Sequence, residues 1–250
     1  MRRPMVAGNW KMCGDRSVNE SLVAGVLGGV GDDLAVDVVI CPPAVYLSQV
    51  AAQIKGSELA LAGQDCAFAA QGAYTGEISA GMLADVGCQY VIIGHSERRQ
   101  HFGETDALVV EKFKLIQSNG LVPILCVGET LEQRESGLAN DVVCGQLMAV
   151  VDAVGVDAFL SAVVAYEPVW AIGTGLTATP EQAQEMHAYI RALVASKGGR
   201  VAEELRVLYG GSVKPENARK LFSQADIDGG LVGGASLEAE KFVAIVKAVI

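Results

Sequence analysis

Glu167 is a carboxylate placed where a strand should end. The preceding run, 162–165, is apolar and rich in β-branched residues, which is typical of a strand buried on both faces. Pro168 stops further strand pairing because proline lacks an N–H and fixes φ. The loop that follows carries apolar residues and two glycines, and it ends at the capping residue Thr179 before a helix. The sequence therefore predicts an ionisable group at a strand tip, beside a loop that could close over it and exclude water.

His95 follows another apolar run, 90–94, and begins a polar segment, 96–99. A histidine at the start of a helical turn receives the dipoles of backbone N–H groups, which disfavour its cationic form. We therefore expect a neutral imidazole that can donate a hydrogen bond to a carbonyl oxygen.

Lys11 and two glycine-rich loops could together bind an anion. Lys11 lies near the end of the first apolar run, whereas Gly210-Gly211-Ser212 and Gly233-Gly234 follow the last two runs and precede helix patterns. Glycines let the backbone approach a ligand, and the N–H groups at helix N-termini favour anions. The pattern favours a phosphate site, with Lys11 as an electrostatic clamp and Glu97 as its ion-pair partner.

Eight short apolar runs, separated by helix-like segments, must position these groups. The runs are 5–10, 36–41, 59–64, 90–95, 121–127, 162–165, 205–210 and 227–232, and the clearest helix patterns are 105–119, 138–154, 180–197, 215–222 and 237–249. Pro123 weakens the fifth prediction, because proline removes a donor from the ladder. This alternation predicts a single-domain α/β protein, a (β/α)8 barrel over residues 1–250. A doubly wound open sheet also alternates, but no GxGxxG follows the first run.

In such a barrel, the active site lies at the carboxyl ends of the strands. One amine, one imidazole and one carboxylate should therefore converge there with the two glycine-rich loops. The residues predicted at these ends are Asn9, Lys11, Gln64, His95, Ser96, Glu97, Cys126, Glu167, Ser212, Gly233 and Gly234.

Composition narrows the functional classes. Hydrophobic residues make up 51% of the chain and charged residues 19%, which permits a large core and does not indicate disorder. The formal charge of -10 argues against nucleic acid and anionic membranes as partners, although a local basic group can still attract a small anion. Neither a signal peptide nor a membrane-spanning segment is expected. The six scattered cysteines, without CxxC, indicate reduced thiols of a cytoplasmic protein and no metal site.

Five segments resemble the triosephosphate isomerase family, and they occur in the family's order along the whole chain. They are Asn9–Met12, Gly72–Glu77, Gly94–Arg99, Ala165–Gly175 and Tyr209–Val213. The set is far more specific than any one segment. The resemblance implies interconversion of dihydroxyacetone phosphate and D-glyceraldehyde 3-phosphate through an enediolate, in glycolysis and gluconeogenesis. It implies neither a cofactor nor a metal.

The resemblance also implies roles for individual residues. Glu167 matches the family's base, which moves a proton between adjacent carbons, and His95 matches its neutral electrophile. The family is the best-known case of such a pair beneath a closing lid. Lys11 and Asn9 match residues that stabilise the enediolate and bind substrate. The phosphate grip is matched by Gly173, Ser212, Gly233 and Gly234, and supporting positions by Ser96, Glu97 and Cys126.

The loop after Glu167 matches the family's lid. Its residues are Pro168, Val169, Trp170, Ala171, Ile172, Gly173, Thr174, Gly175, Leu176, Thr177 and Ala178. Leu176 stands where the family commonly has a basic residue, and Asp65 where asparagine is frequent. The resemblance further implies a homodimer, in which the loop around Thr75 inserts beside Lys11 of the partner subunit. Cys13 would lie close to that contact.

Two other functions stay open at this point. One is a different phosphate-binding barrel enzyme, such as an aldolase that forms a Schiff base through Lys11. Borohydride trapping with substrate would separate it, because an isomerase leaves no covalent adduct. The other is a binding protein without catalytic activity, against which the intact Lys11, His95 and Glu167 argue.

Overall fold

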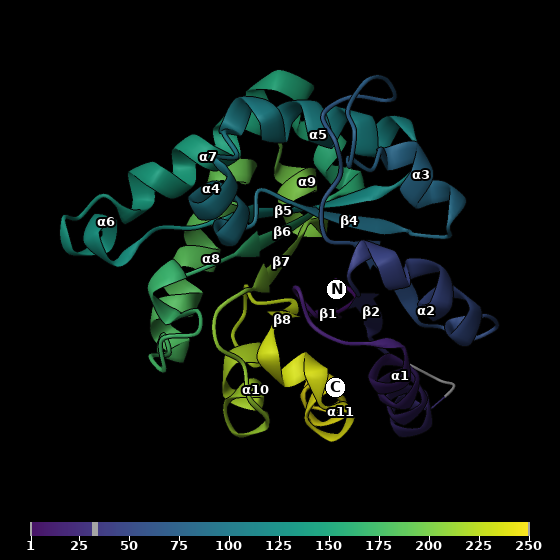
Figure 1. The fold of residues 1–250 in the computed structure, drawn as a ribbon. Coiled ribbons are helices and arrows are strands. Elements are labelled where there is room, and N and C mark those ends of the chain that lie inside the picture. Colours follow the sequence, from purple (N-terminus) through teal and green to yellow (C-terminus); the bar gives the residue numbers. More distant parts are fainter. Residues whose placement is uncertain (1, 32–34, 250) are drawn as a thin grey trace.

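Eight parallel strands close into a barrel in the order of the sequence (Figure 1). The structure is a computed structural model that describes residues 2–31 and 35–249. The strands are β1 (Met5–Asn9), β2 (Asp37–Cys41), β3 (Ala60–Gly63), β4 (Tyr90–Ile93), β5 (Val122–Val127), β6 (Val163–Tyr166), β7 (Arg206–Tyr209) and β8 (Gly229–Val232). Each overlaps one of the predicted apolar runs, so the predicted (β/α)8 barrel is confirmed.

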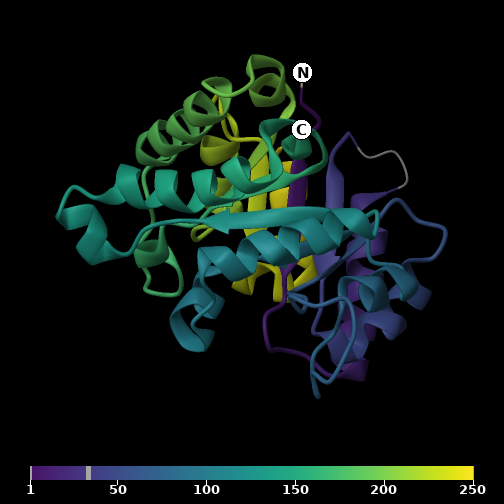
Figure 2. The same ribbon diagram turned by 90° about the horizontal axis from the view of Figure 1, so that it is seen from above.

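Helices form a layer outside the barrel (Figure 2). They are α1 (Arg16–Val30), α2 (Leu47–Ile54), α3 (Ala80–Asp85), α4 (Ser96–Phe102), α5 (Asp106–Ser118), α6 (Leu131–Glu135), α7 (Ala139–Val154), α8 (Pro180–Ala195), α9 (Gly199–Glu204), α10 (Pro215–Phe222) and α11 (Ala239–Lys247), with short 3-10 turns η1 (Ala44–Tyr46), η2 (Val156–Ser161), η3 (Val169–Ala171) and η4 (Gly234–Leu237). The five clearest helix patterns correspond to α5, α7, α8, α10 and α11. None of the described helices is long and apolar enough to span a bilayer.

Pro123 lies inside β5 without disturbing the ladder. The neighbouring Val122 donates its N–H to Gln89 beside β4, so position 123 faces the other neighbour, β6. The register of β5 with β6 begins only at Ile124, which pairs with Val163. Proline therefore occupies a place where no ladder donor is needed, and our reservation about this strand was unnecessary.

Alternate strand residues fill two separate apolar layers. Met5 and Ala7 of β1 point into the barrel, where they pack with Ile92 and Leu208. Val6 points outward and joins the larger core between strands and helices. Burial on both faces explains why the strands are apolar throughout rather than alternating.

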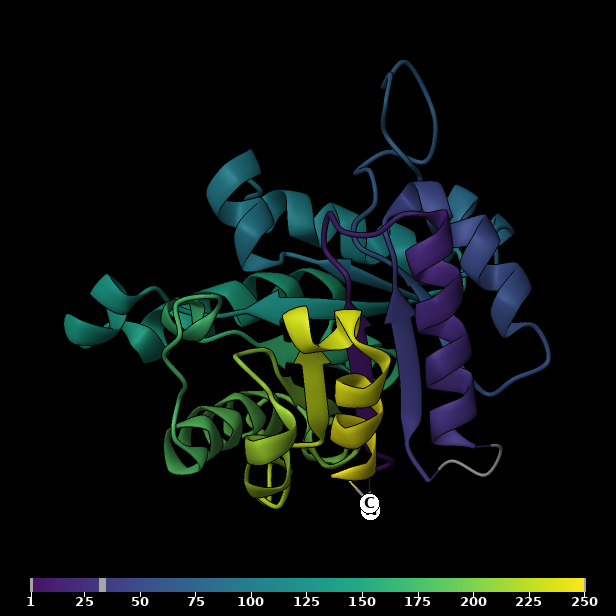
Figure 3. The ribbon, with the colours of Figure 1, turned by 60° about the horizontal axis from the view of Figure 1, so that its bottom comes forward.

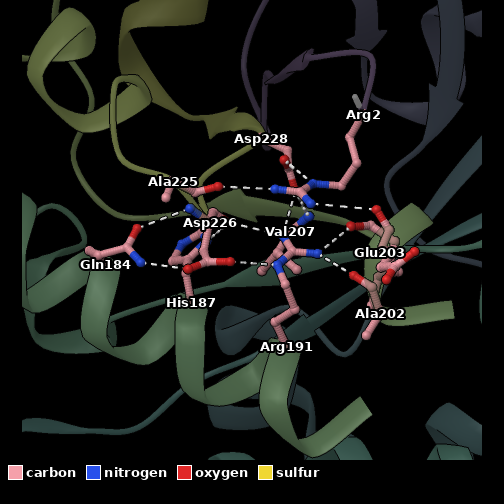
Figure 4. A network of polar contacts seen from close by, with 11 residues as sticks. Arg2, Gln184, His187, Arg191, Ala202, Glu203, Val207, Ala225, Asp226 and Asp228 are labelled. Carbon is pink, nitrogen blue, oxygen red and sulfur yellow. Dashed lines mark hydrogen bonds and ion pairs between the residues drawn. The ribbon is translucent and has the colours of Figure 1, made fainter. Parts of the chain in front are cut away.

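An ion-pair network ties the barrel together at the amino ends of its last strands (Figure 4). Arg191 of α8 lies 2.7 Å from Asp226 and 2.8 Å from Asp228, and Arg2 lies 2.6 Å from Asp228. Asp228 also accepts the backbone N–H of Val207 in β7 at 2.8 Å. Between β7 and β8 only one residue pair is in register, so this network supplements a short ladder.

His187 is buried beside this network. Its Nδ1 lies 3.2 Å from the carbonyl oxygen of Asp226, and its ring meets the ring of Tyr166 edge to face at 5.8 Å. Burial lowers the pKa of His187 to about 3, because the charged imidazolium would lose its hydration. The folded protein therefore holds this histidine neutral.

This burial predicts a specific loss of stability in acid. An unfolded histidine has a pKa of about 6.5, so below that pH the unfolded chain binds a proton that the folded protein does not. The contribution is complete at about pH 7.5 and above and declines as pH falls toward 3, by roughly 3 kcal/mol between pH 7.5 and 4.5. Urea unfolding at pH 7.5 and 4.5 should show that His187→Gln loses less stability than the wild type over this interval. The exposed His101→Gln is the control, and equal losses in both variants would contradict the assignment.

Candidate active site

A cavity of about 730 Å³ opens at the carboxyl ends of the strands. It brings together residues from both ends of the chain, as a closed barrel requires. The predicted catalytic and substrate-binding residues all line it: Asn9, Lys11, His95, Glu167, Gly173, Ser212, Gly233 and Gly234. Ser96, Glu97 and Cys126 lie behind this lining, in contact with it.

Glu167 follows β6 and is only 2% exposed. Its carboxylate accepts the backbone N–H of Ser96 at 2.9 Å and the Ser96 hydroxyl at 3.2 Å, and it lies 3.0 Å from Nε2 of His95. Burial raises the pKa of the Glu167 carboxyl, but the contacts with His95 and Ser96 outweigh burial and hold this pKa below its ordinary value. The group is thus a buried but ionised carboxylate.

Two glycines make room for Glu167. A Cβ on Gly128 would lie 1.8 Å from the carbonyl oxygen of Glu167, and a Cβ on Gly210 would lie 2.8 Å from its Cγ. Sequence analysis missed the role of Gly128 and took Gly210 only as part of an anion-binding loop. The available signal was weak, since Gly128 simply follows the fifth apolar run.

His95 is the N-cap of α4, and its Nδ1 accepts the backbone N–H of Glu97 at 3.2 Å. This hydrogen bond requires an unprotonated Nδ1, so the ring proton of the neutral form lies on Nε2, facing Glu167. Burial lowers the pKa of His95, but the carboxylates of Glu167 and Glu97 outweigh burial and raise it. The acceptor role of Nδ1 fits the neutral ring that the sequence predicts, and the adjacent Glu167 carboxylate, which the prediction left out, favours the charged form. The neutral state of His95 therefore stays a prediction.

Lys11 reaches the cavity through an unusual backbone conformation. In the described part of the chain it is the only non-glycine residue with a positive φ, at 54°, which costs about 1–3 kcal/mol. Asn9 stabilises this turn by accepting the Lys11 N–H on Oδ1 at 3.0 Å, and Gln64 donates to the Lys11 carbonyl at 2.8 Å. Nζ of Lys11 lies 2.5 Å from Glu97, which is the expected ion pair.

The loops after β7 and β8 are held by short-range hydrogen bonds. Asn217 donates to the carbonyl of Ser212 at 3.1 Å and accepts the N–H of Lys214 at 2.8 Å. The carbonyl of Gly233 accepts the backbone N–H of Ser236 at 2.8 Å and its hydroxyl at 2.7 Å. Both loops therefore present fixed backbone to the cavity.

The segment from Pro168 to Ala178 is anchored at its start and exposed at its tip. Buried Glu129 accepts hydrogen bonds from Trp170 Nε1 at 2.9 Å and Tyr166 Oη at 3.0 Å, and Arg134 lies 3.2 Å away. The residues from 173 to 177 are all exposed. Sequence analysis missed Glu129, whose position directly after Gly128 at a strand end was the available clue.

The remaining predicted positions lie around this centre. Cys126 is buried within the barrel, and burial together with the Glu167 carboxylate raises its pKa well above the ordinary thiol value, so it is not a thiolate. Cys13 is exposed and lines the cavity rim. Thr75 is also exposed but does not line this cavity. Among the described residues, no group of three or more His, Cys, Asp and Glu side chains could hold a metal ion.

Comparison with known proteins gives a consistent result. A family model described as triosephosphate isomerase matches residues 4–249. A curated protein from Alcanivorax borkumensis is 57% identical over 247 residues, which covers 99% of this chain and 98% of that protein. Relatives from Dechloromonas aromatica and Ectopseudomonas mendocina are each 56% identical, over 248 and 249 residues, with 99% of both chains covered. All three carry the name triosephosphate isomerase.

The contact between Glu167 and His95 predicts a shift in a histidine titration. Glu167→Gln removes the carboxylate that raises the pKa of His95, whereas the burial that lowers this pKa remains. His95 should therefore titrate above about 6.5 in the wild type and below it in the variant. Ring-labelled NMR can follow the three histidines of the chain, with His187 as the internal control. The same His95 pKa in both proteins would contradict the electrostatic assignment.

Proposed function

The chain belongs to the triosephosphate isomerase family, and on that premise we propose how its residues carry out the reaction. The protein interconverts dihydroxyacetone phosphate and D-glyceraldehyde 3-phosphate, a step of glycolysis and gluconeogenesis. One observation carries the residue assignment: an ionised carboxylate, an imidazole and an amine line the same cavity as two glycine-rich loops. The aldolase and the non-catalytic binding protein are set aside by the family assignment.

Glu167 is the base in this proposal. To reach a substrate carbon, its carboxylate leaves Ser96 and turns into the cavity. The contacts with His95 and Ser96 are what hold its pKa down, whereas burial holds it up. When Glu167 gives up its contacts with His95 and Ser96 and faces the substrate in a site without water, the pKa of its carboxyl rises. Glu167 is then a stronger base at the moment when it removes the substrate proton.

His95 and Lys11 stabilise the charge that then develops on the substrate oxygens. Once Glu167 has moved, the imidazole loses the neighbour that raises its pKa, and Nδ1 still accepts from Glu97. Neutral His95 can then donate its Nε2–H to the carbonyl oxygen. Lys11 and Asn9 lie on the same wall, and losing one such donor typically costs about 3–4 kcal/mol.

The phosphate group binds between the loops after β7 and β8 in this proposal. Ser212, Gly233 and Gly234 line the cavity there, and Lys11 passes directly over Gly233, where a Cβ would lie 3.2 Å from Lys11 Cε. Backbone N–H groups at such positions suit a dianion. Gly173 would contribute its N–H from the closed lid.

We also propose that the enzyme is a homodimer. Met12, Val45 and Phe102 are 96%, 81% and 70% exposed, and they follow β1, β2 and β4, with exposed Tyr74 after β3. Because these strands are consecutive in the barrel, their loops are neighbours, and large exposed apolar groups in one region mark an interface. The loop between β3 and α3, which carries Thr75, projects from the body of the protein (Figure 3). In the dimer, Cys13 would lie beside this loop of the partner subunit. Sedimentation should show a dimer, and a monomer at micromolar concentration would exclude the proposal.

We infer that residues 1–250 form one domain and that the enzyme is cytoplasmic, which its six free thiols support. Neither nucleic acid nor membrane is proposed as a partner, given the formal charge of -10. Fractionation of cells would test the location.

Glu167→Gln tests the reaction and the base together. The variant keeps the shape of the side chain but cannot accept the proton, so kcat should fall by about 10²–10⁴-fold while affinity for inorganic phosphate changes little. A coupled isomerase assay measures kcat in both directions. The exposed Glu240→Gln is the control and should match the wild type. A kcat within tenfold of the wild type would remove Glu167 from the role of base.

The lid should become ordered when a phosphate compound binds. Its start is anchored on Glu129 and its tip is exposed, so closure would bury apolar residues and exclude water from the enediolate. Hydrogen exchange in residues 168–178 should slow at saturating glycerol 3-phosphate, whereas exchange in α1 should not change. Unchanged exchange in the lid would count against closure.

A further inference from the structure

The net negative charge of the protein opposes the entry of an anionic substrate into the cavity. The chain carries a formal charge of -10, and its substrate is a phosphate dianion, so the mean field of the protein repels the molecule it must bind. Glu167, Glu216 and Glu238 add carboxylates to the cavity wall. A local cation is needed to reverse the sign of the field at the entrance.

Three lysines line the cavity within the described part of the chain, and they differ in their partners. Lys11 is paired with Glu97 at 2.5 Å, and Lys241 is paired with Glu238 at 2.7 Å. Lys214 has no ion pair with any described residue. It is the one lysine of the three whose ammonium group has no carboxylate of a described residue within ion-pair distance.

The backbone fixes where this charge sits. Lys214 lies two residues after Ser212 and just before α10, and its N–H donates to Asn217 Oδ1 at 2.8 Å. Asn217 also donates to the carbonyl of Ser212, so one side chain ties Lys214 to the loop of the phosphate grip. The side chain of Lys214 is exposed, whereas the paired Lys11 is half-buried deeper in the site.

We propose that Lys214 is an outer capture residue for the substrate, whose unpaired charge draws the phosphate dianion toward the loops after β7 and β8. This inference rests on the proposed phosphate site. Lys214 acts on the approaching and loosely bound dianion, and Lys11 acts on the reacting molecule. An exposed lysine is usually only a solvated surface group, but this one lines the cavity and lacks the partner that its two neighbours have.

The proposal predicts a fall in capture without a fall in chemistry. Lys214→Met should lower kcat/KM by roughly 3- to 10-fold at about 10 mM ionic strength, where a single charge near a dianion is poorly screened. The value of kcat should not change. At about 0.5 M salt the difference should shrink to less than twofold, because screening shortens the range of the charge to a few ångströms.

Two further variants separate a local charge from the net charge of the protein. Glu216→Gln removes a carboxylate from the same rim and should shift kcat/KM upward at low salt. Lys220 lies on α10, which begins directly after Lys214, and it does not line the cavity; Lys220→Met changes the net charge by the same amount as Lys214→Met. It should change kcat/KM by less than twofold.

Titration with inorganic phosphate, followed by tryptophan fluorescence, makes the test independent of turnover. The dissociation constant for phosphate should rise in Lys214→Met and fall in Glu216→Gln, by factors similar to those in kcat/KM. If Lys214→Met matches Lys220→Met in both measurements, or if it lowers kcat itself, the capture role is wrong. A wild-type protein that binds phosphate but does not isomerise would contradict the proposed function and leave this test intact.

Discussion

The contact of Glu167 with Ser96 and His95 is the constraint on which the rest of the site depends. It joins the carboxyl end of β6 to the first turn of α4, two strands away around the barrel. A buried carboxylate survives in this place only because three donors replace its water. Glu167 packs so closely against Gly128 and Gly210 that neither glycine position has space for a side chain. The barrel must therefore hold four neighbouring strand ends, those of β4 to β7, in a fixed register before any chemistry is possible.

The charged groups that stabilise the fold lie at the amino ends of the strands, whereas the reactive groups lie at the carboxyl ends. At the amino ends, Asp228 has a backbone donor and two arginines, so its charge is fully compensated and static. At the carboxyl ends, Glu167 has partners that it can exchange for a ligand. Both are buried carboxylates, and the difference lies in whether the cavity offers an alternative partner. This separation lets the loops vary while the core stays the same.

Much of the fold was predictable because its signals are local. Short apolar runs marked every strand, and capping at Thr179 marked the start of α8. The site residues at strand ends followed from the barrel itself. What could not be predicted depended on register between distant segments: the effect of Glu167 on His95, the space left by Gly128, and the anchoring of the lid on Glu129. Pro123 shows the same limit, since only the start of β6 explains why it is tolerated.

Burial and polar contacts have opposite effects on the pKa of Glu167. This opposition explains why the carboxylate is ionised before substrate binds and becomes a strong base in the reaction. Burial alone would protonate Glu167, and its contacts alone would make it a weak base. Because the two effects oppose each other, moving the carboxylate a short way changes its pKa without unfolding anything. The barrel supplies the burial, which is permanent, and α4 supplies the contacts, which are exchangeable. The activity of this carboxylate is thus set by which of its two environments it occupies, and the lid that begins at Pro168, the next residue, lies where it can couple that choice to the presence of ligand.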